Sequence, residues 1–360
     1  MNFLRKLILL GFLVVTFFVG NNVQANEVGF SVEPLFPKNQ LDQKAGYFHL
    51  LMEPDTSQEI QVKLKNTIDK EVSLAAWVSS AKTNVNGVID YSDSNNEIDA
   101  SLEHDLSKLV EIEDNITLPP KSEKIIDITV KMPGGRFEGI IAGGITFEEK
   151  KEGQLEGVSS HTGIKNKFSY VIALLMQQQK EVYVQPELTI GKVAPTQLNS
   201  KSSISAEIRN VASVFLNDIT VETTITDKKT KKVVFEDKKT NFQMAPNTTM
   251  DLPLFLNGEK LEPGEYHYKA FISGKNGSDE FDTMEWELES DFEVDRKIAK
   301  ELNKTDTQQE DNKTLSWWVY LLIILNALLA VAVVTFLVVK NRKSNKVQKK
   351  RKKKKLKRLM

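Results

Sequence analysis

The stretch Glu59-Ile60-Gln61-Val62-Lys63-Leu64-Lys65 decides the fold class, because apolar and polar residues alternate along it without interruption. A period of two puts one row of side chains on each face of an extended strand, whereas a helix repeats every 3.6 residues. The same alternation recurs at residues 72–78, 126–130, 204–208, 219–225 and 266–272. Each segment therefore predicts a strand with one buried and one solvated face.

Turn signals separate these segments. They are Asn86-Gly87, Pro119-Pro120, Pro133-Gly134-Gly135, Asn257-Gly258, Pro263-Gly264 and Asn276-Gly277. Many short strands joined by such turns predict an all-β fold class, with two tandem immunoglobulin-like antiparallel β-sandwich domains. One helical stretch is expected within residues 100–110, where Leu102, Leu106 and Leu109 have helical spacing.

The N-terminal residues carry a secretory pattern. Arg5 and Lys6 precede the apolar segment Leu7–Gly20, and Val23-Gln24-Ala25 matches a small-residue cleavage site. We predict a signal peptide over residues 1–25, cleaved after Ala25, with an uncleaved signal anchor as the alternative.

A longer apolar segment lies near the other end. Residues 317–339 are long enough to span a hydrocarbon core of about 30 Å as a helix. The tail 340–360 holds 13 Lys/Arg and no Asp or Glu, and such flanks stay in the cytoplasm. We therefore predict a single-pass type I protein of the cell membrane, with Trp317, Trp318 and Tyr320 at the outer interface. No Leu-Pro-x-Thr-Gly sequence precedes the helix, so we expect it to be retained as an anchor.

Charge is divided between the two sides of this predicted span. All 49 Asp/Glu and 33 of the 48 Lys/Arg lie in residues 26–316, so that region carries a formal charge of −16. An acidic ectodomain argues against nucleic acid as a partner, because phosphate binding needs clustered cations. The basic tail read alone resembles a nucleic-acid patch, but next to a span it is better explained as a topology signal.

Composition divides the ectodomain further. Residues 148–164 are polar and rich in Gly and Ser, as linkers and long hairpin loops are. Residues 168–176 beyond them are apolar enough for a buried strand of the first domain. We predict a first sandwich domain over 26–186, a second over 187–298, and a polar stalk without regular structure over 299–316. This order places the second domain near the membrane and the first farther out.

Residues for catalysis or metal binding are scarce. The chain has no cysteine, and its four histidines (His49, His104, His161 and His267) lack metal-ligand spacing. The stretch Gly139–Gly144 has no following lysine and predicts a strand whose glycines permit a bulge or close backbone approach. We expect no catalytic residues, no metal and no cofactor.

Two groups of side chains invite a binding hypothesis. Asp90, Asp93, Asn95, Glu97 and Asp99 suggest calcium, but Ile98 stands where the turn glycine should be, so a solvated loop is the better interpretation. Exposed aromatic rings can stack on sugars, and Tyr47, Trp77 and Tyr91 are the candidates for glycan binding. Each is also a common core residue, and the sequence does not separate the two roles.

Several short motifs occur in an order that resembles a known family. They are Phe30–Pro34, Gly46–Leu50, Ala81–Asn84 and Gly139–Phe147 in the first half, and Met244–Asn247, Leu261–Tyr266 and Trp286-Glu287-Leu288 in the second. The chain resembles the WxL-interacting surface proteins of Gram-positive bacteria, which also end in one spanning helix and a basic tail. The single Trp286-Glu287-Leu288 tripeptide is expected to be an ordinary strand with Trp286 and Leu288 on one face.

The resemblance implies a function. The first domain would bind cell-wall peptidoglycan, and the second would bind host extracellular matrix or surface proteins, in a complex with secreted WxL-domain proteins. A non-catalytic surface adaptor is therefore the first hypothesis. A surface receptor or sensor is the alternative, although the short tail leaves no room for a signalling domain. An enzyme ranks third, because no nucleophile–base or metal set is visible.

Overall fold

The computed structural model describes residues 29–92, 98–150, 168–276 and 283–307, together with residues 321, 322, 324, 325 and 328. The chain divides into two compact units. The first comprises Met1–Thr196, Ser203–Leu254 and Pro263–Asp295 and holds the sheets of both sandwiches. The second comprises Gln197–Ser202, Phe255–Glu262 and Arg296–Met360.

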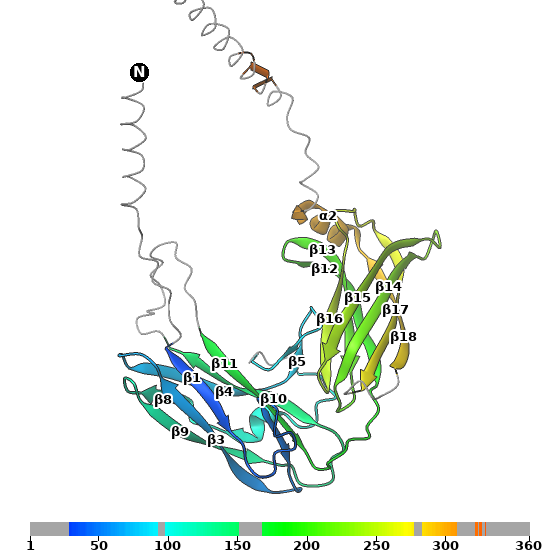
Figure 1. The fold of residues 1–360 in the computed structure, drawn as a ribbon. Coiled ribbons are helices and arrows are strands. Elements are labelled where there is room, and N and C mark those ends of the chain that lie inside the picture. The colour runs from blue at the N-terminus through cyan, green and yellow to red at the C-terminus, as the bar shows by residue number, and fades with distance from the viewer. Residues whose placement is uncertain are drawn as a thin grey trace, which may run out of the picture. The chain divides into compact units, whose positions relative to one another are not determined.

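The first sandwich packs a four-stranded sheet, in the order β1-β3-β9-β7, against a five-stranded sheet in the order β2-β11-β10-β4-β8 (Figure 1). A small hairpin, β5-β6, is added. The strands are β1 Phe30–Leu35, β2 Phe48–Leu51, β3 Ser57–Asn66, β4 Val72–Ser80, β5 Lys82–Thr83, β6 Ile89–Asp90, β7 Val110–Glu111, β8 Asn115–Leu118, β9 Glu123–Lys131, β10 Ile141–Glu149 and β11 Ser169–Gln177.

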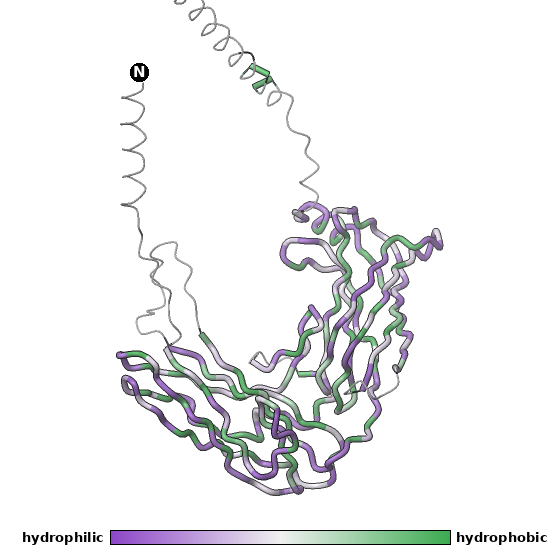
Figure 2. The backbone as a smooth tube through the Cα atoms, viewed as in Figure 1, coloured by the Kyte–Doolittle hydropathy of each residue, from purple (hydrophilic) through white to green (hydrophobic). Residues whose placement is uncertain are grey.

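The predicted alternation builds the core of this sandwich. Ile60, Val62 and Leu64 of β3 are buried, and β3 pairs Ile60 with Ile128 of β9. Their apolar rows face the row of β4 and the apolar residues of β10 and β11 across one continuous core. Figure 2 follows the same alternation of hydrophilic and hydrophobic residues along the strands. The structure confirms the strand predicted over 168–176, because β11 pairs with β10 and extends the five-stranded sheet.

One pairing departs from the expected antiparallel pattern. β2 runs parallel to β11, with Leu174 opposite Phe48 and Met176 opposite Leu50. Alternation predicts which face of a strand is buried. It does not predict the direction of the neighbouring strand, because parallel and antiparallel pairing both satisfy the backbone hydrogen bonds.

The glycines of β10 permit close packing, as predicted for residues 139–144. A Cβ added at Gly143 would lie 2.1 Å from the carbonyl oxygen of Ser79 and 2.4 Å from Cδ2 of Leu106. Leu106 belongs to η1, a 3-10 helix over Leu106–Lys108. The longer helical stretch expected in residues 100–110 was therefore wrong. Asp105 caps a single turn by accepting a hydrogen bond from the backbone N–H of Ser107, and β7 begins at Val110.

The second sandwich has a three-stranded sheet, in the order β12-β13-β16, and a four-stranded sheet in the order β15-β14-β17-β18. Buried alternate residues of β13, β14 and β17 supply its core, as predicted from residues 204–208, 219–225 and 266–272. Its strands are β12 Leu188–Leu198, β13 Lys201–Asn210, β14 Leu216–Asp227, β15 Val233–Met244, β16 Thr248–Phe255, β17 Gly264–Asn276 and β18 Thr283–Val294. The predicted domain boundary at 186/187 falls between β11 and β12.

A helix replaces the start of the predicted stalk. α2 spans Arg296–Thr305 and buries Ala299 and Leu302, so the expectation of a structureless segment from residue 299 was wrong. The segment is polar on average, yet its two buried apolar residues are three apart and share one helical face. Residues 308–316 lie outside the described part of the chain.

The predicted membrane segment is described at five positions only, namely Leu321, Leu322, Ile324, Leu325 and Leu328, all exposed and helical. Within the described residues, no helix has the length and apolar character needed to cross a membrane. The predicted signal peptide, the interface residues Trp317, Trp318 and Tyr320, and the tail 340–360 lie outside those residues.

The close approach at Gly143 makes a stability prediction. Gly143→Ala should lower the free energy of unfolding by about 1–3 kcal/mol, because backbone atoms cannot make room for the added methyl group. Gly46→Ala is the matched control, since a Cβ there meets nothing within 4 Å. Urea unfolding of both variants measures the effect, and equal midpoints would contradict the packing described for β10.

Candidate functional site

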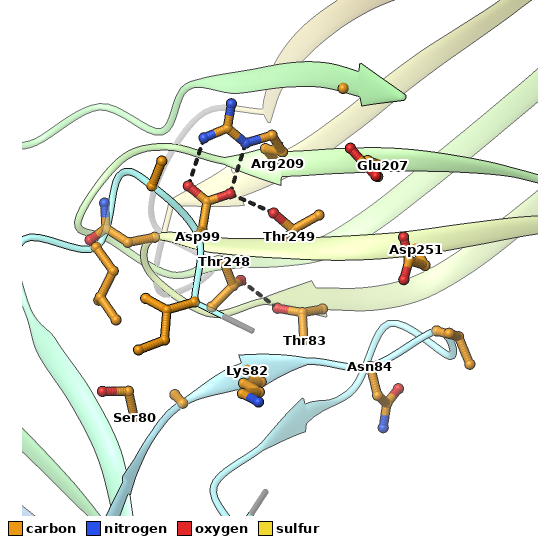
Figure 3. A pocket seen from close by; sticks show the side chains of 17 residues that line it. Ser80, Lys82, Thr83, Asn84, Asp99, Glu207, Arg209, Thr248, Thr249 and Asp251 are labelled. Atoms are coloured by element: carbon orange, nitrogen blue, oxygen red, sulfur yellow. Dashed lines mark hydrogen bonds and ion pairs between the residues drawn. The ribbon is translucent and has the colours of Figure 1, made fainter. Parts of the chain in front are cut away.

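A polar pocket of about 1000 Å³ opens in the first compact unit (Figure 3). Residues from the first sandwich form one side, and residues from β13, β16 and their neighbours form the other. The lining residues are 80–85, 98–100 and 102, and then Gly191, Glu207, Arg209, 247–249 and Asp251. Binding pockets usually enclose about 300–1000 Å³, so this one can hold a ligand of several rings.

A buried ion pair forms one wall. The guanidinium of Arg209 donates two hydrogen bonds to Asp99, from Nε to Oδ2 and from Nη2 to Oδ1, each 2.7 Å long. Thr249 Oγ1 also donates to Asp99, and the N–H and hydroxyl of Ser101 donate to its Oδ1. The Asp99 side chain is 2% exposed and that of Arg209 is 31% exposed. The carboxylate is thus held by five donors, which is how a buried charge is tolerated.

These contacts set the protonation state of the pair. The hydrogen bonds from Arg209 hold the pKa of Asp99 well below its usual value, and those from Thr249 and Ser101 act in the same direction against the effect of burial. The pKa of Arg209 is raised by the same bond. Asp99 is therefore an anion across the physiological range, and the interpretation of residues 90–99 as a solvated loop was wrong at this position. The carboxylate is buried because it meets a cation 110 residues away in sequence.

A hydroxyl and amide network continues from the ion pair. Thr248 donates to the carbonyl oxygen of Ala245, so the 2.7 Å contact between Thr83 and Thr248 is a bond from the Thr83 hydroxyl. Thr83 in turn accepts the N–H of Ala245 at 3.0 Å. The side-chain amide of Asn247 donates to the carbonyl oxygens of Ser101 and Val211. Each buried polar group in this network has a partner, as low-polarity surroundings require.

Backbone bonds and a small apolar cluster complete the contact between the two sandwiches of the first unit. The N–H of Ile140 donates to Ser213, and the N–H of Gln243 donates to Gly87, each at 2.8 Å. Ala81, Ala142, Leu175 and Ala245 form the cluster. Small residues let the backbones approach, which explains why Gly and Ala are used here.

Charged groups line the remaining part of the pocket. Figure 3 places Glu207 and Asp251 along the wall away from the Asp99–Arg209 pair, with Lys82 on the side of the first sandwich. Glu207 Oε2 accepts the N–H of Lys192 at 2.9 Å, so its second oxygen is available to a ligand. The pocket thus offers carboxylates, an ammonium group, hydroxyls and amides. This set suits a polar ligand with hydroxyl and amide groups.

The three predicted glycan-binding aromatics lie outside the pocket lining but gather around residues 91 and 92. Tyr47 and Tyr91 pack on the small apolar cluster. The indole N–H of Trp77 donates to the carbonyl oxygen of Ser92 at 3.1 Å. Burial, and secondarily the neighbouring Tyr47, raises the pKa of Tyr91 to about 12. All three are half-buried and structurally engaged, and a role in glycan binding stays a prediction.

A second charged surface lies on the four-stranded sheet of the second sandwich. β18 is an edge strand among the described strands, and five of its alternate residues are exposed carboxylates: Glu285, Glu287, Glu289, Asp291 and Glu293. Lys228, His267 and Lys269 pair with the middle of this row. Hydrogen bonds from Lys228 and His267 hold the pKa of Asp291 below its usual value. Trp286 and Leu288 share the opposite, half-buried face, as predicted.

Sequence reasoning missed the residues that build the pocket. Asp99 was noticed only as part of an acidic stretch, and no local pattern marks Glu207, Arg209 or Asp251. Among the described residues, no group of three His, Asp or Glu side chains is placed to hold a metal ion. In the lining, the Thr249 hydroxyl donates to Asp99, whose pairing with Arg209 and lowered pKa make it a poor general base.

Comparison with protein families decides what kind of chain this is. A profile described as the WxL Interacting Protein peptidoglycan binding domain matches residues 30–149, and one described as the WxL Interacting Protein host binding domain matches residues 159–304. The chain belongs to the WxL-interacting protein family. Both matched families are binding domains. The second match includes β11, although that strand is hydrogen-bonded into the five-stranded sheet of the first sandwich.

Solved structures add a distant likeness. The class 5 fimbriae chaperone CfaA is 12% identical, covers 72% of this chain and 98% of its own, and has a TM-score of 0.30. The E. coli chaperone DraB is 14% identical, with coverages of 74% and 96% and a TM-score of 0.27. These scores are too low to support an inference about partners. No curated protein matches the chain.

The ion pair makes a prediction with a defined pH dependence. Asp99→Asn should lower the free energy of unfolding at pH 7 by about 2–3 kcal/mol, less than a fully buried pair because Arg209 is partly exposed. The pKa of Asp99 is lower in the folded state, so its contribution is present above an unfolded pKa of about 3.9 and is lost as pH falls below it.

The difference in the free energy of unfolding between wild type and Asp99→Asn, measured by urea unfolding, should therefore shrink as the pH falls below about 4. Glu33→Gln is the control, because its exposed pair with Lys63 should contribute less than about 1 kcal/mol. A difference in the free energy of unfolding that does not change with pH would contradict the stabilising role given to the ionised Asp99.

Proposed function

We propose that the chain is a non-catalytic adaptor of the cell surface, anchored in the membrane, that binds peptidoglycan and secreted WxL-domain or host matrix proteins. The observation that carries this proposal is the tandem match to a peptidoglycan-binding and a host-binding domain over residues 30–149 and 159–304. Two binding domains in one chain link two partners, which is what an adaptor does.

The anchor is supported by the sequence. Residues 317–339 have the length and apolar character of a span, and the 13 Lys/Arg that follow favour a cytoplasmic tail. The described ectodomain would then face the cell wall.

We assign the peptidoglycan unit to the polar pocket. Glu207, Asp251 and Lys82 surround a space that suits a disaccharide bearing a short peptide, whose hydroxyl, amide and charged groups need both donors and acceptors. Because β13 and β16 supply Glu207, Arg209, Thr248, Thr249 and Asp251 to the lining, the assignment requires residues of both matched domains.

Sedimentation with protein-free peptidoglycan tests this assignment. Residues 26–316 should co-sediment, and Glu207→Gln with Asp251→Asn should weaken binding about tenfold, because two charge-assisted hydrogen bonds are reduced. The basic tail is omitted because it would bind any anionic wall polymer. Glu59→Gln with Glu71→Gln, both exposed outside the pocket, makes the same charge change as a control. Folded protein that stays in the supernatant would refute wall binding, and equal binding by both double variants would refute the pocket.

We assign protein partners to β18. An edge strand offers unpaired backbone groups to an added strand, and its row of carboxylates favours a partner strand rich in Lys or Arg. Electrostatic attraction would mainly speed association and select basic partners.

Capture of a purified WxL-domain protein tests this surface. Binding should fall as salt rises, and Glu285→Lys with Glu293→Lys should reduce it at least about tenfold at low salt, since attraction becomes repulsion. Glu59→Lys with Glu71→Lys is the matched control in surface plasmon resonance. Salt-insensitive capture, or an equal loss in the control, would argue against recognition through β18.

A further inference from the structure

Helix α2 is held firmly within the second compact unit. The side-chain amide of Asn303 both donates to and accepts from the backbone of Leu261, at 2.8 and 2.9 Å. The hydroxyl of Ser202 donates to the carbonyl oxygen of Leu302, and the carboxylate of Asp306 accepts the N–H of Ser202. With Ala299 and Leu302 buried, these bonds define which face of the helix points outward.

The outward face is cationic. Arg296, Lys297, Lys300 and Lys304 are all exposed. Positions 297, 300 and 304 are three and four apart, so they share one face, opposite Ala299 and Leu302. None of the four forms an ion pair with a residue that the structure describes. Ile298, 39% exposed, flanks this face.

This arrangement conflicts with the usual electrostatics of a helix. The N-terminal end of a helix favours carboxylates, yet the first turn of α2 has no acidic residue and begins with Arg296 and Lys297. Cations there do not help the helix to form. Asp295, directly before the helix, supplies a carboxylate at that end, so the cations of the first turn are not required by the helix itself.

The charge of α2 also contrasts with the rest of the ectodomain. Residues 26–316 carry a formal charge of −16, whereas the helix itself has four cations and one carboxylate, Glu301. After α2, the chain continues for only eleven residues, 306–316, before the apolar segment begins. Eleven residues reach at most about 40 Å, so the helix cannot lie far from whatever holds that segment.

We propose that the outward face of α2 lies on the anionic phospholipid headgroups of the membrane. The proposal rests on the membrane anchor proposed above. Lysine and arginine bury their aliphatic stems at the interface while their charged ends contact lipid phosphates. Basic residues beside a span are attracted to anionic lipid, and Ile298 can enter the boundary between headgroups and acyl chains. The helix would thus seat an otherwise acidic ectodomain at a defined contact on the bilayer.

A single fluorescent label tests the contact in the full chain. Because the chain has no cysteine, Glu301→Cys gives one labelling site beside the lysines, and Lys70→Cys gives a control site in the exposed loop between β3 and β4 of the first sandwich. Each labelled chain is placed in nanodiscs that contain a headgroup spin-labelled quencher lipid. One set combines phosphatidylglycerol with phosphatidylcholine, and the other contains phosphatidylcholine only.

We expect quenching at residue 301 in anionic nanodiscs to exceed that in neutral nanodiscs by at least about threefold, and to decrease with salt. Lys300→Glu with Lys304→Glu should remove the difference, whereas Lys70→Glu with Lys44→Glu, two exposed lysines of the first sandwich, should not when measured with the label at residue 301. Circular dichroism confirms that each variant keeps its strand content. The control label at residue 70 should show no dependence on lipid charge.

The outcomes separate the two proposals. A chain that enters nanodiscs but shows equal quenching at residue 301 in both lipids overturns the headgroup contact and leaves the anchor in place. A chain that does not enter nanodiscs overturns the anchor and the contact together. Quenching that survives Lys300→Glu with Lys304→Glu also overturns the contact.

Discussion

Asp99 imposes the constraint on which the pocket depends. A carboxylate whose side chain is 2% exposed is tolerated only where cations and donors surround it, and here Arg209, Thr249 and Ser101 do so. The pair fixes the segment after residue 98 against β13 and β16. The hydroxyl pair of Thr83 and Thr248 and the apolar cluster around Ala245 join the same two sides of the pocket.

Local charge, more than net charge, distinguishes the surfaces of this protein. Screening limits an exposed charge to about 8 Å at physiological salt, so a partner responds to the nearest patch. The carboxylate row of β18 and the lysine face of α2 therefore present opposite signs within one chain whose formal charge is −1. A single average over the sequence hides both.

The strands were largely predictable because their information is local. Ile60, Val62 and Leu64 repeat every second residue, and β3 buries all three. Gly143 was correctly expected to allow close approach, since a glycine within an apolar strand often marks the point where another backbone comes near. α2 was missed because only two of its ten residues are buried apolar side chains, and its stability depends on packing against residues that are distant in sequence.

The sequence by itself determined the all-β class and the family, because periodicity and short motifs are local features that can be read along the chain. Tertiary structure decided that β2 runs parallel to β11, that Asp99 is buried, and that Glu207 and Asp251 face one pocket with Lys82. Those facts depend on contacts between residues that are more than 100 positions apart in sequence. Pairing between distant residues is selected by the free energy of the whole fold, and no local pattern encodes it.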